Sequence, residues 1–206
     1  MPLLDIFSAA VRARAVPIFP LNTVLFPGGV LPLRIFEARY VDMASDCLKR
    51  SAPFGVCLIR DGKEVGPPAV PVRIGCLARI ADCDAEQLGV LKVRAEGLER
   101  FRIASSEVTK AGLIVADVEP LAAEAPAPDA PGLGECAELL RKLIAGIGAE
   151  RFVPPLRFED ATWVGFRLAE ILPLRNDVKQ KLLEVTDATM RLAVLHKFLK
   201  QQKLIA

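Results

Sequence analysis

Cysteine and histidine are the side chains of this sequence that could bind a metal ion or act as a nucleophile. The chain has five cysteines and one histidine. The cysteines are Cys47, Cys57, Cys76, Cys83 and Cys136. No two of them form a C-x-x-C pair, and a four-ligand zinc site with a single histidine would need unusual chemistry. Cys47, Cys57 and Cys76 lie in apolar patterns typical of small core residues, so we expect neither a metal site nor a cysteine nucleophile.

The other groups that could transfer protons are better explained as structural. His196 lies in an apolar stretch of a predicted helix, which favours a partly exposed structural histidine over a catalytic base. Glu37, Asp42 and Asp46 share another predicted helix, and this pattern is typical of a solvated acidic face rather than an acid/base pair. The sequence therefore predicts no catalytic residue and no cofactor.

The composition is that of a globular chain at the apolar end of the usual range. Of its 206 residues 52% are hydrophobic and 25% are charged, and 27 basic and 25 acidic residues give a formal net charge of +2. This balance does not indicate a broad surface for nucleic acid. The first residues, MPLLDIFSAAVRARAV, place Asp5 before any basic residue and do not resemble a signal peptide. With an odd number of thiols, we expect reduced cysteines and a cytoplasmic protein.

One stretch, residues 15–33, contains no charged side chain and raises the question of a membrane segment. It is interrupted repeatedly, by Pro17, Pro20, Pro27 and Pro32 and by Gly28 and Gly29. These residues would break the hydrogen-bond ladder of a membrane helix, so no membrane association is expected. Because proline is tolerated at strand ends and sheet edges, we predict strands over residues 16–19 and 30–35, joined by a loop.

The rest of the first half is predicted to be rich in β-structure, with one helix. Residues 37–50 carry apolar side chains at helical spacing, and residues 54–59 and 112–120 are typical of strands. In LGVLKVRAEGLERFRIASSEV, apolar and charged residues alternate on both sides of Glu96-Gly97. This alternation predicts a hairpin with its turn at Glu96-Gly97.

The second half is predicted to be helical and to follow a linker. Residues 121–132 contain three prolines and have little to bury, which is typical of a linker. Beyond it we predict four helices, with Asn176 capping the third and Thr186 capping the fourth. The predicted organisation is an extension over residues 1–13, a β-domain over 14–120, the linker over 121–132 and a helical subdomain over 133–206.

Several stretches carry a resemblance through their joint order and spacing. They are PIFPLNTVLFPGGVLPLRIFEARY, FGVCLI, RIGCLARIADCD, LKVRAEGLERFRI and LAEILPLRNDVKQKLLEVTDATMRLAVL. The strongest parts are the P-x-x-P-L…F-P-G…P-L-x-I-F-E-x-R-Y block and the G-x-x-R-F-x-I pattern. Over residues 16–199 the chain resembles the N-terminal, substrate-recognition domain of bacterial Lon protease.

This resemblance implies both a fold and a role. The fold would be α+β, a PUA-like β pseudo-barrel with one packed helix followed by a helical bundle subdomain. The role would be recognition of unfolded or specific polypeptide segments, or of a protein partner, in a setting related to proteolysis and protein quality control. The sequence has no G-x-x-x-x-G-K-[ST] loop for ATP and nothing that matches the Ser-Lys pair of the Lon protease domain. We therefore expect a stand-alone, non-enzymatic binding module.

The candidate peptide-binding surface is the proline-braced apolar edge. It comprises Phe26, Pro27, Pro32, Phe36 and Tyr40, with Arg34 and Arg100 as possible hydrogen-bond donors at its rim. The alternative is that these side chains seal the barrel against its helix and that both arginines are ordinary surface residues. We expect Phe36 and Tyr40 to be buried and Phe26, next to Pro27-Gly28-Gly29, to be the exposed contact.

Two other functions compete with polypeptide binding. RNA could bind if Lys92, Arg94, Arg100 and Arg102 share the outer face of the predicted hairpin, although nearby glutamates and scarce aromatic residues disfavour it. A small molecule could bind in a cleft between the two halves. The identity of the client or partner and the oligomeric state are not encoded in any pattern found in the sequence.

Overall fold

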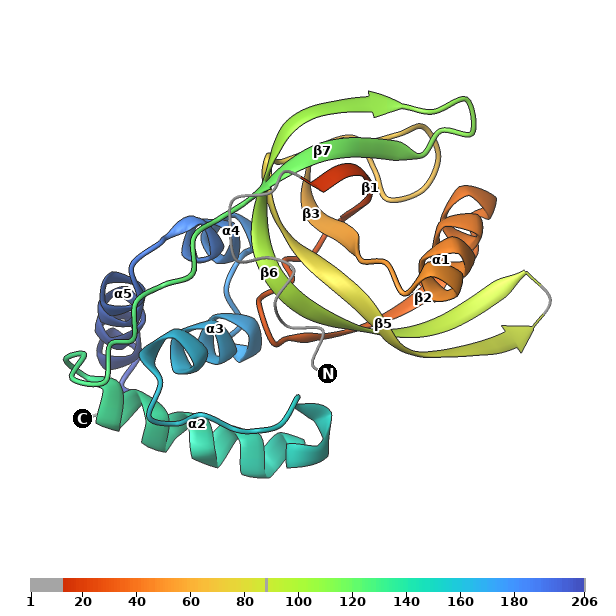
Figure 1. Cartoon of the computed structure of the whole chain (residues 1–206). Coiled ribbons are helices and arrows are strands. Elements are labelled where there is room, and N and C mark those ends of the chain that lie inside the picture. The colour runs from red at the N-terminus through yellow and green to blue at the C-terminus, as the bar shows by residue number, and fades with distance from the viewer. Residues whose placement is uncertain (1–12, 88, 206) are drawn as a thin grey trace, which may run out of the picture.

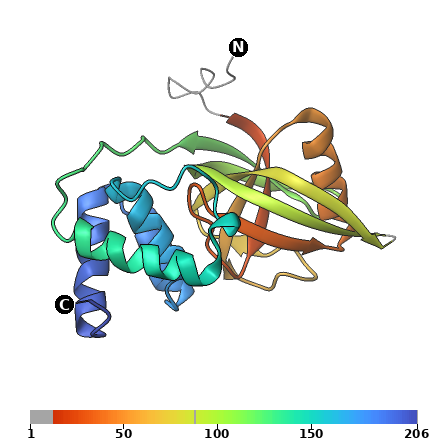
Figure 2. The same ribbon diagram turned by 90° about the horizontal axis from the view of Figure 1, so that it is seen from below.

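A computed structural model of the chain describes residues 13–87 and 89–205 (Figure 1). The predicted extension over residues 1–13 and the prediction about a signal peptide fall almost entirely outside these residues. In the described part, a β-barrel and a group of helices lie side by side, and residues 121–132 connect them without forming a helix or strand (Figures 1 and 2).

The first half forms a pseudo-barrel. Its strands are β1 (Ala13–Leu21), β2 (Val30–Ile35), β3 (Phe54–Asp61), β4 (Val70–Pro71), β5 (Ile74–Gln87), β6 (Val90–Val108) and β7 (Ile114–Pro120). Neighbouring strands follow the order β1-β7-β6-β5-β3-β4, and all these pairs are antiparallel. A parallel pairing of β1 with β3 closes the ring. The α+β fold with a β pseudo-barrel is therefore confirmed.

The ring is incomplete next to β2. β5 occupies one edge of β6, and the other edge is shared by β2, which pairs with residues 91–96, and β7, which pairs with residues 101–108. β7 reaches β1 only as far as Ile18, although β1 continues to Leu21. No strand pairs with the second edge of β2 within residues 13–87 and 89–205. A gap in the hydrogen-bonded ring therefore separates the end of β1 from β2.

The turn predicted at Glu96-Gly97 is wrong, because β6 runs through both residues without interruption. Gly97 is needed for a close approach of two backbones. A Cβ atom there would lie 2.2 Å from the carbonyl oxygen of Phe26. The N–H of Gly28 donates to the carbonyl of Gly97 and the N–H of Gly97 to that of Gly29, both at 2.8 Å. The glycine therefore holds the 26–29 loop against β6.

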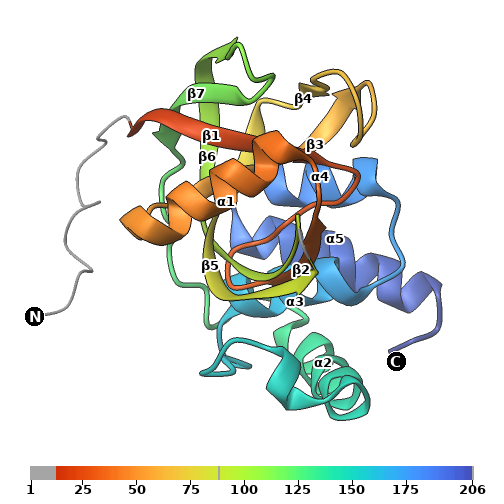
Figure 3. The same cartoon turned by 90° about the vertical axis from the view of Figure 1, so that its right-hand side faces the viewer.

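Helix α1 (Ala38–Arg50) packs across one end of the barrel (Figure 3). The predicted apolar stripe is buried at Tyr40, Met43, Ala44 and Cys47, whereas Leu48 is exposed. These four side chains join the barrel core. The helix ends at Ser51, whose left-handed conformation lets its N–H reach back to the last carbonyls.

The second half is a helical subdomain. It contains α2 (Leu133–Ile147), a short 3₁₀ helix (Ala149–Arg151), α3 (Ala161–Ile171), α4 (Asn176–Glu184) and α5 (Ala188–Gln201). Asp187, not Thr186, caps α5 by accepting the N–H of Met190, and α4 begins at Asn176 without a side-chain cap. No helix within residues 13–87 and 89–205 is long and apolar enough to cross a lipid bilayer.

Candidate functional site

A hollow of about 280 Å³ opens at the gap between the end of β1 and β2. We call it the edge groove. Its lining comes from β1 and Thr23 beyond it, from β2 and the start of α1, and from the loop between β3 and β4. The lining residues are Phe19, Leu21, Thr23, Leu31, Pro32, Leu33, Arg34, Ile35, Phe36, Glu37, Tyr40, Glu64 and Val65.

The edge groove contains four of the seven predicted binding residues, namely Pro32, Arg34, Phe36 and Tyr40. Pro32 and Arg34 are exposed. Tyr40 is buried, as predicted, and stacks on Phe19 with ring centroids 4.1 Å apart. The prediction that Phe36 is buried is wrong, because 55% of it is exposed. Side chains alternate along a strand, so Phe36 continues the outward face of Pro32 and Arg34 just beyond β2.

The β3–β4 loop supplies a second apolar contact that the sequence analysis missed. Val65 is 55% exposed on the rim of the edge groove. Two contacts hold its loop: the N–H of Asn22 donates to Glu64 Oε1 at 2.5 Å, and Arg39 donates to the carbonyl of Gly66 at 2.7 Å. Nothing in the local pattern DGKEVGPP signals a binding role, since its position depends on these long-range contacts.

Two carboxylates of the edge groove differ in their surroundings. Glu37 is paired with Arg39 at 2.8 Å. Among the described residues, the N–H of Asn22 is the single donor to Glu64, and no lysine or arginine of that part forms an ion pair with it. Arg34 lines the same groove from β2.

The other three predicted binding residues, Phe26, Pro27 and Arg100, lie at the junction between the barrel and the helices. The prediction that Phe26 is an exposed contact is wrong. Phe26 is fully buried, belongs to the helical core and packs on Phe166 with ring centroids 5.8 Å apart. Arg167 explains this placement, because it donates to the carbonyls of Pro27 and Gly28 and so pulls the loop under α3.

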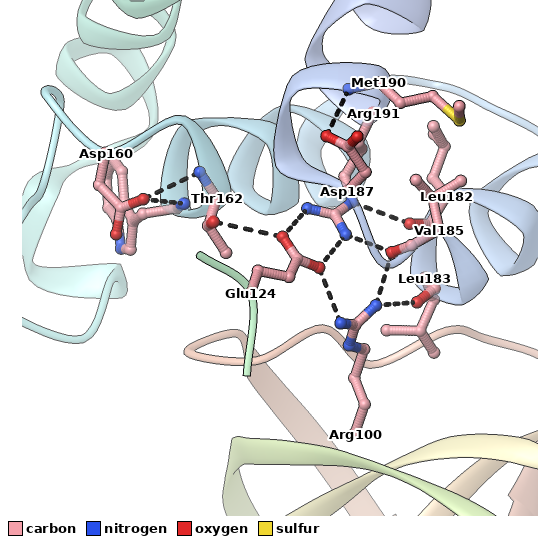
Figure 4. A network of polar contacts seen from close by, with 11 residues as sticks. Arg100, Glu124, Asp160, Thr162, Leu182, Leu183, Val185, Asp187, Met190 and Arg191 are labelled. Atoms are coloured by element: carbon pink, nitrogen blue, oxygen red, sulfur yellow. Dashed lines mark hydrogen bonds and ion pairs between the residues drawn. The ribbon is translucent and has the colours of Figure 1, made fainter. Parts of the chain in front are cut away.

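Arg100 is also buried and is not an ordinary surface arginine or a rim donor. Its guanidinium lies 2.7 Å from Glu124 Oε1 and donates to the carbonyls of Leu183 and Val185 at 2.8 and 2.6 Å (Figure 4). Burial lowers the pKa of Arg100, while the Glu124 carboxylate opposes that shift. Arg100 therefore joins the barrel to the end of α4.

Glu124 is the centre of this junction network (Figure 4). Its carboxylate accepts from Arg100, from Arg191 and, at 3.2 Å, from Thr162 Oγ1. Two buried arginines against one glutamate leave a net positive charge. Carbonyls in the last turn of α4 compensate it: they have no partner within the helix, accept from the two arginines and carry the negative end of the helix dipole. Residues 121–132 are therefore anchored at Glu124, although the linker pattern indicated little to bury.

Neither Glu124 nor Arg191 was predicted from the sequence as a functional or structural contact. A signal for Arg191 exists, since it interrupts the buried stripe that Ala188, Leu192 and Leu195 form on α5. A charged residue in an apolar stripe indicates a buried partner. Glu124 has no comparable signal, because it lies in an Ala/Pro-rich segment without periodicity.

A second hollow of about 280 Å³ lies at this junction, where a small-molecule site was considered. Two of its polar side chains, Arg100 and Glu124, are paired with each other. Asp160 accepts the N–H groups of Thr162 and Trp163 at the start of α3. Glu99 is the third acidic residue that lines the hollow, and burial raises the pKa of its carboxyl. Most polar groups of this hollow are thus committed to structure.

The groups considered for catalysis or metal binding are dispersed. The described residues contain no group of three or more His, Cys, Asp or Glu side chains placed to hold a metal ion. Burial raises the pKa of the Cys57 and Cys76 thiols far above the ordinary value, which makes them poor nucleophiles. His196 is partly exposed and pairs with Glu135 across α5 and α2.

The basic face considered for RNA is not assembled. Arg100 points into the junction, and Arg94 pairs with Glu96 at 2.5 Å. Burial alone would raise the pKa of Glu96, but hydrogen bonds from Arg79 and Arg94 hold it below its ordinary value. Positive charge along β6 is thus partly neutralised by this buried glutamate.

Comparisons with known proteins match most of the chain. The sequence profile of the ATP-dependent protease La (LON) substrate-binding domain matches residues 15–201. The Lon N-terminal domain protein from Xanthomonas campestris is 37% identical, with a TM-score of 0.72 over 89% of this chain and 97% of that one. The N-terminal domain of Lon protease from the Mycobacterium avium complex shares the fold, at 22% identity, a TM-score of 0.63 and coverage of 88% and 96%.

A curated full-length relative shows how much of such a protein the chain spans. Lon protease 2 of Myxococcus xanthus is 28% identical over 92% of this chain, which covers 24% of that protein. The chain therefore spans about a quarter of the length of this relative. The profile match, the crystal structure at 37% identity and the shared fold lead to one conclusion. The chain belongs to the Lon substrate-binding domain family.

Proposed function

We propose that this chain binds unfolded polypeptide segments in the edge groove, as a recognition step of protein quality control. The observation that carries the proposal is the position of Phe36 and Val65. Each is 55% exposed, and both line a hollow beside the edge of β2 with which no described strand pairs. Large apolar side chains exposed together are typical of interaction sites. Family membership supports a role in substrate recognition.

The shape of the edge groove suits an extended chain. At this edge Pro32 has no N–H and the N–H of Val30 already donates to Glu170 Oε1 at 3.3 Å, so an added strand would be held mainly through the carbonyl groups of β2. Side-chain pockets beside the edge provide selectivity. A volume of about 280 Å³ lies at the lower end of the range of ligand pockets. It accommodates a few side chains of a peptide and not a folded domain, so an unfolded segment is the favoured occupant.

We propose that the role is binding without catalysis and that it is carried out in the cytoplasm. All five cysteines are free thiols, which fits a reducing compartment. The buried charges of the junction support the fold, since Arg100, Glu124 and Arg191 bind one another and backbone carbonyls. The bound segment would either be transferred to other proteins or remain bound to this chain.

A pair of aromatic substitutions tests the proposal. Phe36→Ala removes an exposed side chain, so it should weaken binding of labelled, unfolded casein while leaving the thermal melt nearly unchanged. Phe26→Ala serves as the matched control, because the residue is fully buried and outside the groove. It should cost about 3–5 kcal/mol of unfolding free energy. Below its melting temperature it should bind casein as the unchanged protein does.

The opposite pattern would contradict the proposal. Undiminished casein binding by Phe36→Ala would exclude the edge groove. Weakened binding by folded Phe26→Ala would instead locate the contact at the junction between the barrel and the helices.

A further inference from the structure

Glu64 contributes a negative charge to the edge groove that the described part of the chain does not neutralise. The residue is half-buried, and its carboxylate accepts one backbone N–H, that of Asn22. Its other oxygen has no partner among the described residues, and neither oxygen pairs with a lysine or arginine. A partly desolvated carboxylate gains from a cation brought within ion-pair distance.

The other charges of the edge groove do not remove this requirement. Glu37 is already paired with Arg39 at 2.8 Å. Arg34 comes from β2, whereas Glu64 comes from the β3–β4 loop, and the two form no ion pair with each other. The loop is fixed by Arg39 at Gly66, so the Glu64 carboxylate is held in place before any ligand arrives.

From this arrangement we propose that the edge groove selects extended apolar segments that carry a lysine or arginine. The cationic end of that side chain pairs with Glu64, and its aliphatic stem lies along the exposed side chains of Phe36 and Val65. This inference rests on the proposed function, since it names the class of polypeptide that the same groove takes.

A lysine or arginine side chain, with its cationic end and its aliphatic stem, would use both the acidic and the apolar groups of the groove. Lysine and arginine bury their stems on apolar surface while the charged head stays in water or meets an anion. A segment with a glutamate at the same place would bring two carboxylates together and bind more weakly. The groove would thus discriminate among unfolded segments of equal hydrophobicity by charge.

Three labelled peptides test this inference by fluorescence anisotropy. They share one apolar centre and differ only in flanking residues, which are lysine, glutamine or glutamate. Because an exposed or partly exposed ion pair contributes little, the lysine peptide should bind about 1.4-fold to fivefold more tightly than the glutamine peptide. The glutamate peptide should bind least tightly, and high salt should reduce both differences.

Glu64→Gln is the decisive variant, because its amide oxygen can still accept the Asn22 N–H. It should bind the glutamine peptide as before and lose the preference for lysine. Glu159→Gln removes the same charge from an exposed residue outside the groove and should keep that preference. Equal binding of the three peptides, or a lysine preference that survives Glu64→Gln, would overturn the inference while leaving the proposed function standing. Binding of none of the peptides would contradict the proposed function itself.

Discussion

Replacing Glu124 by alanine should destabilise the protein more than any substitution of a surface glutamate. The Glu124 side chain is 3% exposed and accepts from two arginines that are themselves almost fully buried, with 4% exposed for Arg100 and 0% for Arg191. Its removal leaves two guanidinium groups in the junction without an anion. The carbonyls at the end of α4 remain, but they compensate one positive charge only in part.

The magnitude follows from that burial. Removing one partner of a buried ion pair typically costs 3–5 kcal/mol, which in a chain of this length lowers the melting temperature by about 6 to 20 °C. Glu138 on α2 is a matched control. It is 59% exposed, and its ion pairs with Arg141 and Lys142 are 3.5 and 3.9 Å long. Glu138→Ala should cost less than about 1 kcal/mol.

The assay combines thermal melts with limited proteolysis. Glu124→Ala should also accelerate cleavage within residues 121–132, because the variant releases that segment from its anchor. A double variant, Glu124→Ala with Arg191→Met, should recover part of the loss, since it removes one of the stranded charges. Equal melting temperatures for Glu124→Ala and Glu138→Ala would refute the reasoning. So would a double variant whose stability is lower than that of Glu124→Ala by the whole loss that Arg191→Met causes on its own.

Three more outcomes are expected. Gly97→Ala should destabilise by about 1–3 kcal/mol or more in a urea titration, because its Cβ would meet the Phe26 carbonyl at 2.2 Å; an unchanged midpoint would contradict the close approach. In the folded protein the pKa of Glu96 is lower than in the unfolded chain. Its contribution to stability is therefore present when the pH is above the unfolded-chain pKa, and it is lost as the pH falls through the folded-state pKa. Glu96→Gln should therefore lose less stability than the unchanged protein when the pH is lowered from neutral into this acidic range, and equal losses would argue against the shift. In a thiol titration of native protein, the half-exposed Cys83 should react first and the four buried thiols only on unfolding; several fast thiols would contradict the burial.

Local patterns were sufficient to predict most of the fold. The helical spacing of residues 37–50 predicted α1, since an amphipathic stripe is a property of neighbouring residues. The prediction failed at Glu96-Gly97, because glycine is used both for turns and for close backbone contacts. Only the long-range position of Phe26 distinguishes the two uses, and no local pattern contains it.

The candidate site was only half predictable. The sequence pointed to the edge that includes Pro32 and Phe36, but it exchanged the roles of Phe26 and Phe36. The Pro27-Gly28-Gly29 context indicated an exposed loop, whereas Arg167 on the distant helix α3 holds that loop inside. Period-two alternation along β2 could have predicted that Phe36 faces outward. The contribution of the β3–β4 loop could not be predicted, because it depends on tertiary hydrogen bonds.

The most direct test of polypeptide binding in the edge groove is a map of backbone amide shifts in a nuclear magnetic resonance titration. The ligand is the unlabelled lysine-flanked peptide, added to isotope-labelled protein. Binding in the edge groove should produce the largest shifts at Leu31, Leu33 and Ile35 of β2 and at Val65 of the β3–β4 loop. Shifts centred instead on Arg100 and Phe166 at the junction, or spread evenly without saturation, would contradict it.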